Sequence, residues 1–175
     1  MCITAADFRA GDACPEVVLV GACPGRDEEE MGRPFAGQAG GNLSVMLQRL
    51  VVYQPDVFPS VQLDDYSMIN AHSLPRYRGR EGYDGRTQPR KGEVLAQENR
   101  ERFVGKFLQV QPNIVVYLGK AAQFSHEIVL DIIPDIKAFR TGHPSTPAWN
   151  TRPQYAQMER ELKLRLWAEH QFAPV

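Results

Sequence analysis

The sequence has few cysteines, almost no net charge and no long hydrophobic run. Its three cysteines, Cys2, Cys14 and Cys23, form no CxxC pair and leave one thiol over, which argues against a secreted disulfide scaffold and a four-cysteine metal cluster. A formal net charge of -1 excludes a uniformly basic nucleic-acid binder. No run of about 18 apolar residues is present to form a transmembrane helix, and the N-terminus does not resemble a signal peptide. We therefore expect a soluble, cytoplasmic protein without a membrane partner.

The remaining composition fits a single α/β domain over residues 1–175. Apolar residues make up 43% of the chain and charged residues 23%, which excludes intrinsic disorder and suffices for one buried core. Short apolar runs typical of strands buried on both faces occur at residues 17–20, 68–69, 114–118 and 136–139. Segments with helical spacing of apolar residues alternate with them, at residues 43–50, 104–108, 120–130 and 154–167. The alternation predicts an α/β layer fold with a central, largely parallel, four-stranded sheet.

Polar and glycine-rich segments follow these strands, where ligands of such sheets bind. A glycine-rich loop at residues 21–41 follows the first strand and opens onto a helix N-terminus, a place that favours an anion. It lacks both the Lys-Ser/Thr pair of a P-loop and a compact GxGxxG turn. Asn70 follows the second strand, and its amide can read a nucleobase edge. His143 follows the fourth, in a short loop held by the next proline.

Each of these residues has a structural explanation when taken alone. Glycines can serve turn geometry, an asparagine after a strand can end a turn or cap a helix, and a lone histidine is more often structural than catalytic. Phe35 is harder to explain in this way, because this large apolar ring lies between prolines and glycines with no periodic partner. The joint occurrence of these residues at one edge of the sheet favours a functional site.

A basic insert at residues 76–91 interrupts the compact pattern. It holds six cations against Glu81 and Asp84, a net charge of +4, together with Tyr77 and Tyr83. One interpretation is a solvated, partly disordered loop. The other is an arm that contacts DNA, because arginines neutralise phosphates and tyrosines stack on bases. The candidate DNA-binding residues of this arm are Arg76, Arg78, Arg80, Arg86 and Lys91.

Taken together, these motifs resemble the uracil-DNA glycosylase superfamily, and most closely its iron-sulfur bacterial and archaeal (family 4-type) branch. The first motif of that branch, G-E-(A/G)-P-G-x-x-E-D-x-x-G-x-P-F-x-G-x-A-G, aligns without a gap with residues 21–40. The strand ending at Asn70, the segment 112–119 and His143-Pro144-Ser145 resemble its later motifs. The resemblance covers about residues 16–168 and implies a three-layer α/β/α fold of the uracil-DNA glycosylase type.

The resemblance also implies an activity: a monofunctional DNA glycosylase that flips a base, by default uracil, out of DNA and hydrolyses its N-glycosidic bond. Phe35 would stack on the flipped base, Asn70 would bind its Watson–Crick edge, and Gly21 and Ala22 would complete the base pocket. His143 would donate to the pyrimidine O2 as negative charge develops there. Pro144 and Ser145 would press on the DNA, and Glu28 matches the acidic residue of the family loop. This chemistry requires no metal or redox cofactor.

The first departure from the family pattern concerns the catalytic carboxylate. Ala22 stands where the branch has glutamate, and Cys23 follows it, so neither residue can orient the attacking water well. Asp27, Glu28 and Glu29 are nearby substitutes, although a solvated acidic loop explains them equally well. Cys23 would act only as a thiolate of lowered pKa. The smaller, less charged wall also permits another base, such as a hypermodified phage base, in a protein of repair or of defence against foreign DNA.

The second departure is the absence of the four cluster cysteines of the branch. We hypothesise that the basic insert takes over DNA contact from the metal-stapled loop. The expected partner is single- or double-stranded DNA with an extruded base, bound by a monomer. Two other functions stay open: a protein that binds a flipped base without cleaving it, because the carboxylate is missing, and an α/β enzyme acting on free nucleotides, because the glycine-rich loop would hold a phosphate.

Overall fold

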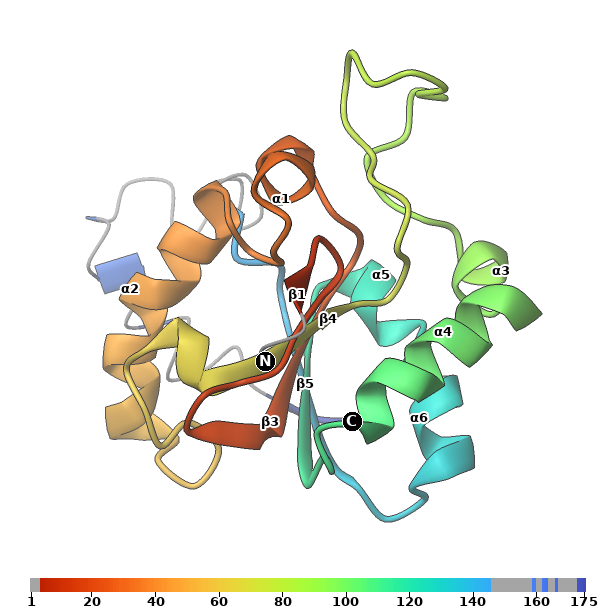
Figure 1. The fold of residues 1–175 in the computed structure, drawn as a ribbon. Helices are drawn as coiled ribbons and strands as arrows, with labels where there is room; N and C mark the ends of the chain where they lie inside the picture. The colour runs from red at the N-terminus through yellow and green to blue at the C-terminus, as the bar shows by residue number, and fades with distance from the viewer. Residues whose placement is uncertain (1–3, 146–158, 160–161, 164–165, 167–172) are drawn as a thin grey trace.

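A mixed sheet forms the centre of the molecule (Figure 1). The structure is a computed structural model that describes residues 4–145, 159, 162–163, 166 and 173–175. The four central strands run parallel and are β4 (Tyr66–Asn70), β3 (Cys14–Gly21), β5 (Ile114–Leu118) and β6 (Lys137–Thr141). Each overlaps one of the four predicted apolar runs, so the predicted parallel sheet is confirmed.

Among the described residues, three two-residue strands extend the sheet beyond this prediction, to seven strands in the order β1-β2-β4-β3-β5-β6-β7. They are β1 (Thr4–Ala5), β2 (Phe8–Arg9) and β7 (Ala173–Pro174), and each pairs antiparallel at an edge. The expected count of four strands is therefore corrected. Two residues carry too little hydrophobic pattern to be seen as a strand in the sequence.

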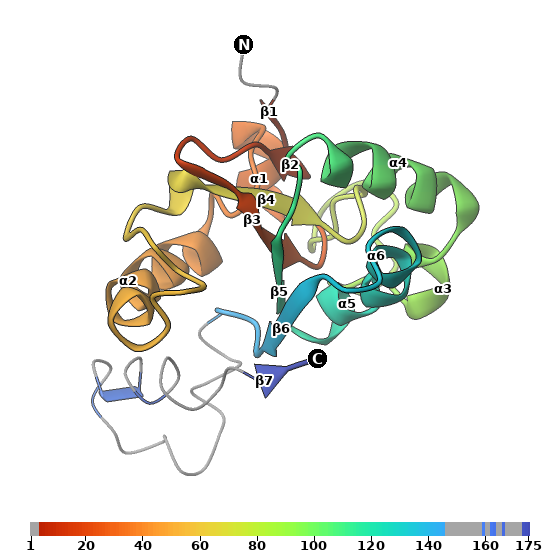
Figure 2. The ribbon, with the colours of Figure 1, turned by 90° about the horizontal axis from the view of Figure 1, so that it is seen from below.

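Helices cover both faces of the sheet, as expected for an α/β/α fold (Figures 1 and 2). On one face lies α2 (Gln38–Tyr53), which packs Leu43, Met46, Leu47 and Leu50 against Leu19, Met68 and Val116. On the other lie α3 (Lys91–Val94), α4 (Gln97–Leu108), α5 (Lys120–Gln123) and α6 (His126–Ile132), packed against Val18, Val20 and Val115. Because neighbouring strand residues point to opposite faces, each apolar strand contributes alternate side chains to the core on either face of the sheet.

Two helical predictions differ from the structure. The segment 120–130 was expected to be one helix, but α5 and α6 are separated at Phe124 and Ser125. The buried Ser125 hydroxyl donates to the Ala122 carbonyl over 2.7 Å, so the side chain competes with the helical backbone there. The helix expected at 154–167 falls almost wholly outside the described residues. Within the described ranges, no helix combines the length and hydropathy needed to span a membrane.

Candidate active site

A cavity of about 360 Å³ lies where the central parallel strands end. Its walls come from the loop after β3 with α1 (Arg26–Met31), from the start of α2, from the end of β4, from the insert and from the loop after β6. The predicted site residues that line it are Gly21, Ala22, Cys23, Asp27, Glu28, Phe35, Asn70, Arg76, His143 and Ser145. The predicted residues that do not line it are Pro144, Arg78, Arg80, Arg86 and Lys91.

Asn70 and Phe35 meet over Gly21 at the floor of this cavity. Asn70 is the last residue of β4 and lies opposite Gly21 of β3 in the sheet register. A Cβ added to Gly21 would lie 2.3 Å from Asn70 Oδ1 and 3.0 Å from Phe35 Cζ. Only a glycine therefore allows the amide and the ring to approach the strand so closely.

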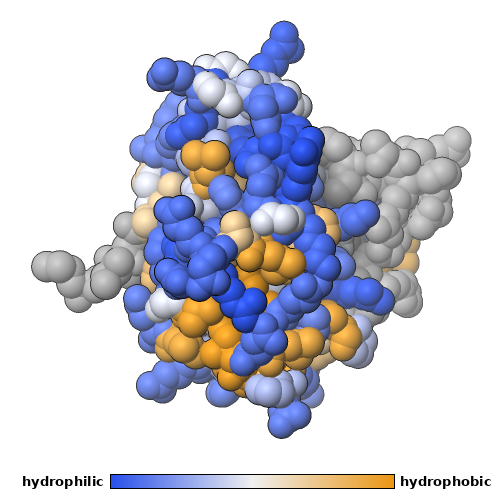
Figure 3. Space-filling view, turned by 90° about the vertical axis from the view of Figure 1, so that its right-hand side faces the viewer, coloured by the Kyte–Doolittle hydropathy of each residue, from blue (hydrophilic) through white to orange (hydrophobic). Residues whose placement is uncertain are grey.

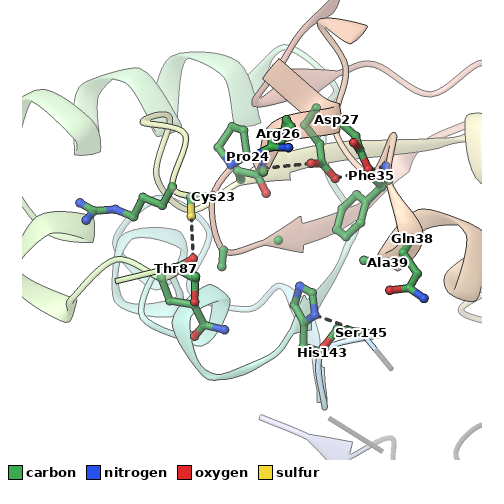
Figure 4. Close-up of a pocket in the computed structure, with 18 residues that line it drawn as sticks. Cys23, Pro24, Arg26, Asp27, Phe35, Gln38, Ala39, Thr87, His143 and Ser145 are labelled. Atoms are coloured by element: carbon green, nitrogen blue, oxygen red, sulfur yellow. Dashed lines mark hydrogen bonds between the residues drawn. The ribbon is translucent and has the colours of Figure 1, made fainter. Parts of the chain in front are cut away.

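Phe35 is held in a left-handed backbone conformation, with φ at 52°. This conformation costs a non-glycine residue about 1–3 kcal/mol, so the surrounding loop has to hold it in place. Glu28 does so in part, because its carboxylate accepts hydrogen bonds from the Gly25 amide (3.0 Å) and the Gly37 amide (3.5 Å). Figure 4 shows the Phe35 ring and the His143 imidazole pointing toward the same space.

His143 presents a defined hydrogen-bond donor. The Ser145 amide donates to His143 Nδ1 over 3.1 Å, so the neutral imidazole carries its proton on Nε2 (Figure 4). Burial lowers the pKa of His143 from its usual value of 6.5, which keeps the ring neutral near pH 7. The arrangement leaves an Nε2–H donor for a group in the cavity.

Asn42 supports the His143 loop and is not apparent from the family motifs. It lies on α2 with 5% of its surface exposed, and its amide donates to the Pro144 carbonyl over 2.8 Å. A sequence signal for it exists, because Asn42 precedes Met46 by four residues and so interrupts the apolar stripe of the helix. A buried polar side chain on an apolar face needs a hydrogen-bond partner, here the Pro144 carbonyl.

The three acidic candidates have different environments. Glu28 is occupied by the two loop amides. Glu29 faces the insert, where it pairs with Arg80 and accepts from the Tyr77 hydroxyl; the hydrogen bond from Arg80 lowers its pKa. Asp27 is exposed, lines the cavity and accepts no hydrogen bond from the residues that the structure describes. Asp27 is therefore the carboxylate best placed to bind water in the cavity.

Cys23 is a thiol rather than a thiolate. Its Sγ–H donates to the Thr87 carbonyl over 3.5 Å, and burial raises its pKa to about 12. The residues also do not fit the iron-sulfur cluster of the resembling branch, since the chain has only three cysteines. Cys14 and Cys23 are both free; Cys14 begins β3, and Cys23 lies in the loop after its end. In the described part of the chain, no three His, Cys, Asp or Glu side chains gather around a possible metal.

Ion pairs hold much of the basic insert. Arg76 pairs with Glu93 over 2.8 Å, Arg86 pairs with Glu93 over 2.9 Å, and Lys91 pairs with Glu127. The hydrogen bond from Arg86 contributes most to lowering the pKa of Glu93, to about 2. The insert rises beside α1 in Figure 1, at the hydrophilic upper end of the face in Figure 3.

Two exposed arginines of the insert have no such pairing. Arg78 and Arg90 form no salt bridge with any residue that the structure describes, and both are exposed. Arg76, in contrast, has a side chain that is only 8% exposed. The unpaired charge of the insert is thus concentrated on Arg78 and Arg90, whereas Arg76, Arg80, Arg86 and Lys91 each pair with a carboxylate of the described residues.

Comparisons with known proteins find similar sequences. The chain matches the model of the uracil DNA glycosylase superfamily over residues 8–169. It is 30% identical over 115 residues to a Type-4 uracil-DNA glycosylase of Archaeoglobus fulgidus, a match covering 65% of this chain and 49% of that protein. It is 52% identical over 42 residues to a Type-4 uracil-DNA glycosylase of Pyrobaculum aerophilum, covering 24% and 21%. The matches thus span half or less of these curated relatives.

Proposed function

The chain belongs to the uracil-DNA glycosylase superfamily, and from this premise we propose that it is a monofunctional DNA glycosylase that removes a flipped base, by default uracil. The observation that carries the proposal is the convergence of Phe35, Asn70 and His143 on one cavity. A stacking ring, a planar amide and a neutral N–H donor are the groups that a flipped pyrimidine needs. The names of the two curated relatives support uracil as the substrate.

The proposed reaction assigns one task to each residue. Phe35 stacks on the flipped base, and Asn70 binds its Watson–Crick edge. As the bond between the sugar C1′ and the base nitrogen breaks, the electron pair leaves with the base and negative charge develops on O2. The Nε2–H of His143 donates a hydrogen bond to that oxygen and keeps its proton. Asp27 orients a water whose oxygen bonds to C1′, and the water's proton passes to the carboxylate.

An oligonucleotide assay tests the proposed function. Single- and double-stranded oligonucleotides containing one uracil are incubated with the protein and then treated with alkali, which cuts abasic sites. We expect cleavage at the uracil only after alkali, and a much lower but still measurable single-turnover rate in Asn70→Ala. Tight binding without cleavage of any substrate would instead identify a base-binding protein. Activity restricted to free nucleosides would contradict a DNA glycosylase.

A larger modified base is the second candidate substrate. Ala22 and the uncharged Cys23 leave the cavity wall beside Gly21 small and neutral. The cavity also extends from Phe35 to Thr87 and Gln88 of the insert. Oligonucleotides carrying hypoxanthine, xanthine or a hypermodified cytosine therefore form a second set of substrates in the same assay. Faster release of one of these bases than of uracil would change the substrate but not the reaction.

Asp27→Asn is expected to lower kcat by about 10²–10⁴-fold with little change in KM, because an amide cannot take up the proton of the water. Glu28→Gln is the matched control, because it likewise replaces a carboxylate by an amide of nearly the same size. Glu28→Gln is expected to lower Tm and to change kcat much less than Asp27→Asn does, since Glu28 holds the loop through two backbone amides. Single-turnover rates and thermal melts measure both effects. A wild-type rate in Asp27→Asn would remove Asp27 from the mechanism.

Arg78→Ala and Arg90→Ala are each expected to weaken DNA binding and to reduce the slope of log affinity against log salt concentration by about one per lost phosphate contact. Fluorescence anisotropy over a salt series measures this slope. Lys137→Ala is the control, because Lys137 starts β6 at the opposite end of the sheet from the cavity. If the slope stays unchanged when both arginines are removed together, the insert does not bind the DNA backbone.

A further inference from the structure

A polar network beside the cavity fixes the backbone of Asn70. The backbone N–H of Asn70 donates to the Asp7 carbonyl over 2.8 Å, and the backbone carbonyl of Asn70 accepts from Arg102 Nη2 over 2.9 Å. The same Nη2 donates to the Ala71 carbonyl over 3.1 Å. Three segments far apart in the sequence, at residues 7, 70–71 and 102, therefore meet around one peptide unit.

The network lies where the pairing of β2 with β4 ends, and on this side Asn70 keeps one backbone hydrogen bond, from its N–H to the Asp7 carbonyl. The pairing of β2 with β4 ends at Phe8 and Ile69, so Asn70 lies one residue beyond the ladder. Its carbonyl would need a donor from a neighbouring strand, and the guanidinium of Arg102 on α4 supplies that donor. A side chain thus supplies the donor that a neighbouring strand would otherwise give to the Asn70 carbonyl at the end of β4.

The guanidinium is itself held by further contacts. Its Nη1 donates to Asp7 Oδ2 over 2.5 Å, and its Nε donates to Asn99 Oδ1 over 3.0 Å. Lys106 Nζ lies 2.8 Å from each carboxylate oxygen of Asp7. The Asn99 amide donates to the Ala71 carbonyl over 2.8 Å. Hydrogen bonds therefore fix the orientation of each side chain in the network, in addition to balancing its charge.

The burial of these charges indicates a role beyond stability. The Asp7 side chain is 8% exposed and that of Arg102 17%. Taking such charges out of water costs several kcal/mol per ion, and apolar residues of similar volume often stabilise a fold equally well. What apolar packing cannot provide is a set of directional hydrogen bonds to the Asn70 and Ala71 carbonyls.

We propose that Arg102, oriented by Asp7 and Lys106, is a positioning residue for the base-binding amide of Asn70. This inference rests on the proposed function, and Arg102 touches no substrate in it. Binding groups need to be held within about 0.5 Å of their productive geometry. The side-chain amide of Asn70 moves with the Asn70 backbone, so the backbone has to be held as closely. Arg102 acts on the reaction only through Asn70.

Arg102→Met tests the proposal in a double-mutant cycle with Asn70→Ala. We expect Arg102→Met to lower kcat for uracil excision by about 10–100-fold in the wild-type background, because small misplacements near the reacting groups are costly. In the Asn70→Ala background it should cause no further loss. Arg100→Met is the control, since Arg100 lies on the same helix and pairs with Asp131 away from Asn70. Additive losses in the cycle would overturn the proposal.

Hydrogen exchange supplies a readout that needs no substrate. The backbone N–H of Asn70 should exchange faster in Arg102→Met than in wild type, whereas Arg100→Met should leave its exchange rate unchanged. Arg102→Lys keeps one charged donor and should restore part of both the protection and kcat, even where Arg102→Met folds poorly. Unchanged exchange in Arg102→Met would overturn the proposal. If the wild-type protein cleaves no uracil-containing DNA, the proposed function fails, and the exchange measurement still tests the network.

Discussion

His143→Ala is expected to lower the single-turnover rate of uracil release by about 10²–10³-fold, the usual effect of removing one preorganised donor to a developing anion. The Ser145 amide directs the donor, because it occupies Nδ1 and leaves the proton on Nε2. DNA affinity should change much less, because the charge on O2 develops only as the bond breaks. The rate and the affinity are measured on the same uracil oligonucleotide.

His143→Gln is the informative companion to this variant. Glutamine keeps an N–H donor, so it should recover part of the rate if donation to O2 is the role of His143. Equal losses in the alanine and glutamine variants would instead indicate that the imidazole acts by its shape or by proton transfer. A wild-type rate in His143→Ala would exclude the residue from the reaction.

The pH profile provides a second test of the neutral imidazole. Burial lowers the pKa of His143 below 6.5, so the rate should be insensitive to His143 titration above pH 6.5. Below its lowered pKa the ring gains a proton on Nδ1, where it faces the Ser145 N–H, and the rate should fall. The same shift means that the unfolded chain binds a proton more readily, so this residue's contribution to stability also declines as the pH falls below 6.5. A rate that rises as the pH falls would indicate that the imidazolium is the active form.

The sequence predicts which residues share the cavity because parallel topology places them at one edge of the sheet. Once residues 17–20, 68–69 and 136–139 are assigned to parallel strands, the residues after them have to lie at one edge of the sheet. Gly21, Asn70 and His143 all follow such strands and all line the cavity. Their individual roles come from the family resemblance and remain proposals.

The charge pairing of the insert could not be predicted in this way. The pattern shows six cations at residues 76–91, but not that Arg80 meets Glu29, 51 residues away. The Arg102–Asp7 contact spans 95 residues and has no periodic signature. Such pairs depend on how loops and helices fold over the sheet, whereas hydrophobic periodicity reports only which face of an element is buried.

Gly21→Ala is expected to lower kcat for uracil excision by about 100-fold while leaving the fold intact. The added methyl group would lie 2.3 Å from Asn70 Oδ1 and 3.0 Å from Phe35 Cζ, so the amide, the ring or both have to move. The amide is the end of a side chain, and it can rotate away while the strand backbone stays in register. The site would lose its base-binding geometry at a small cost in Tm.

Gly105→Ala is the matched control for this substitution. Gly105 lies within α4, and a Cβ there meets nothing within 4 Å. Alanine should therefore leave kcat unchanged and stabilise the helix by about 0.5–1 kcal/mol. Kinetics and thermal melts of both variants separate the two effects. If Gly21→Ala retains the wild-type rate, the close approach of Asn70 and Phe35 over Gly21 is not needed for the reaction. The proposed base-binding roles of these two residues would then be wrong.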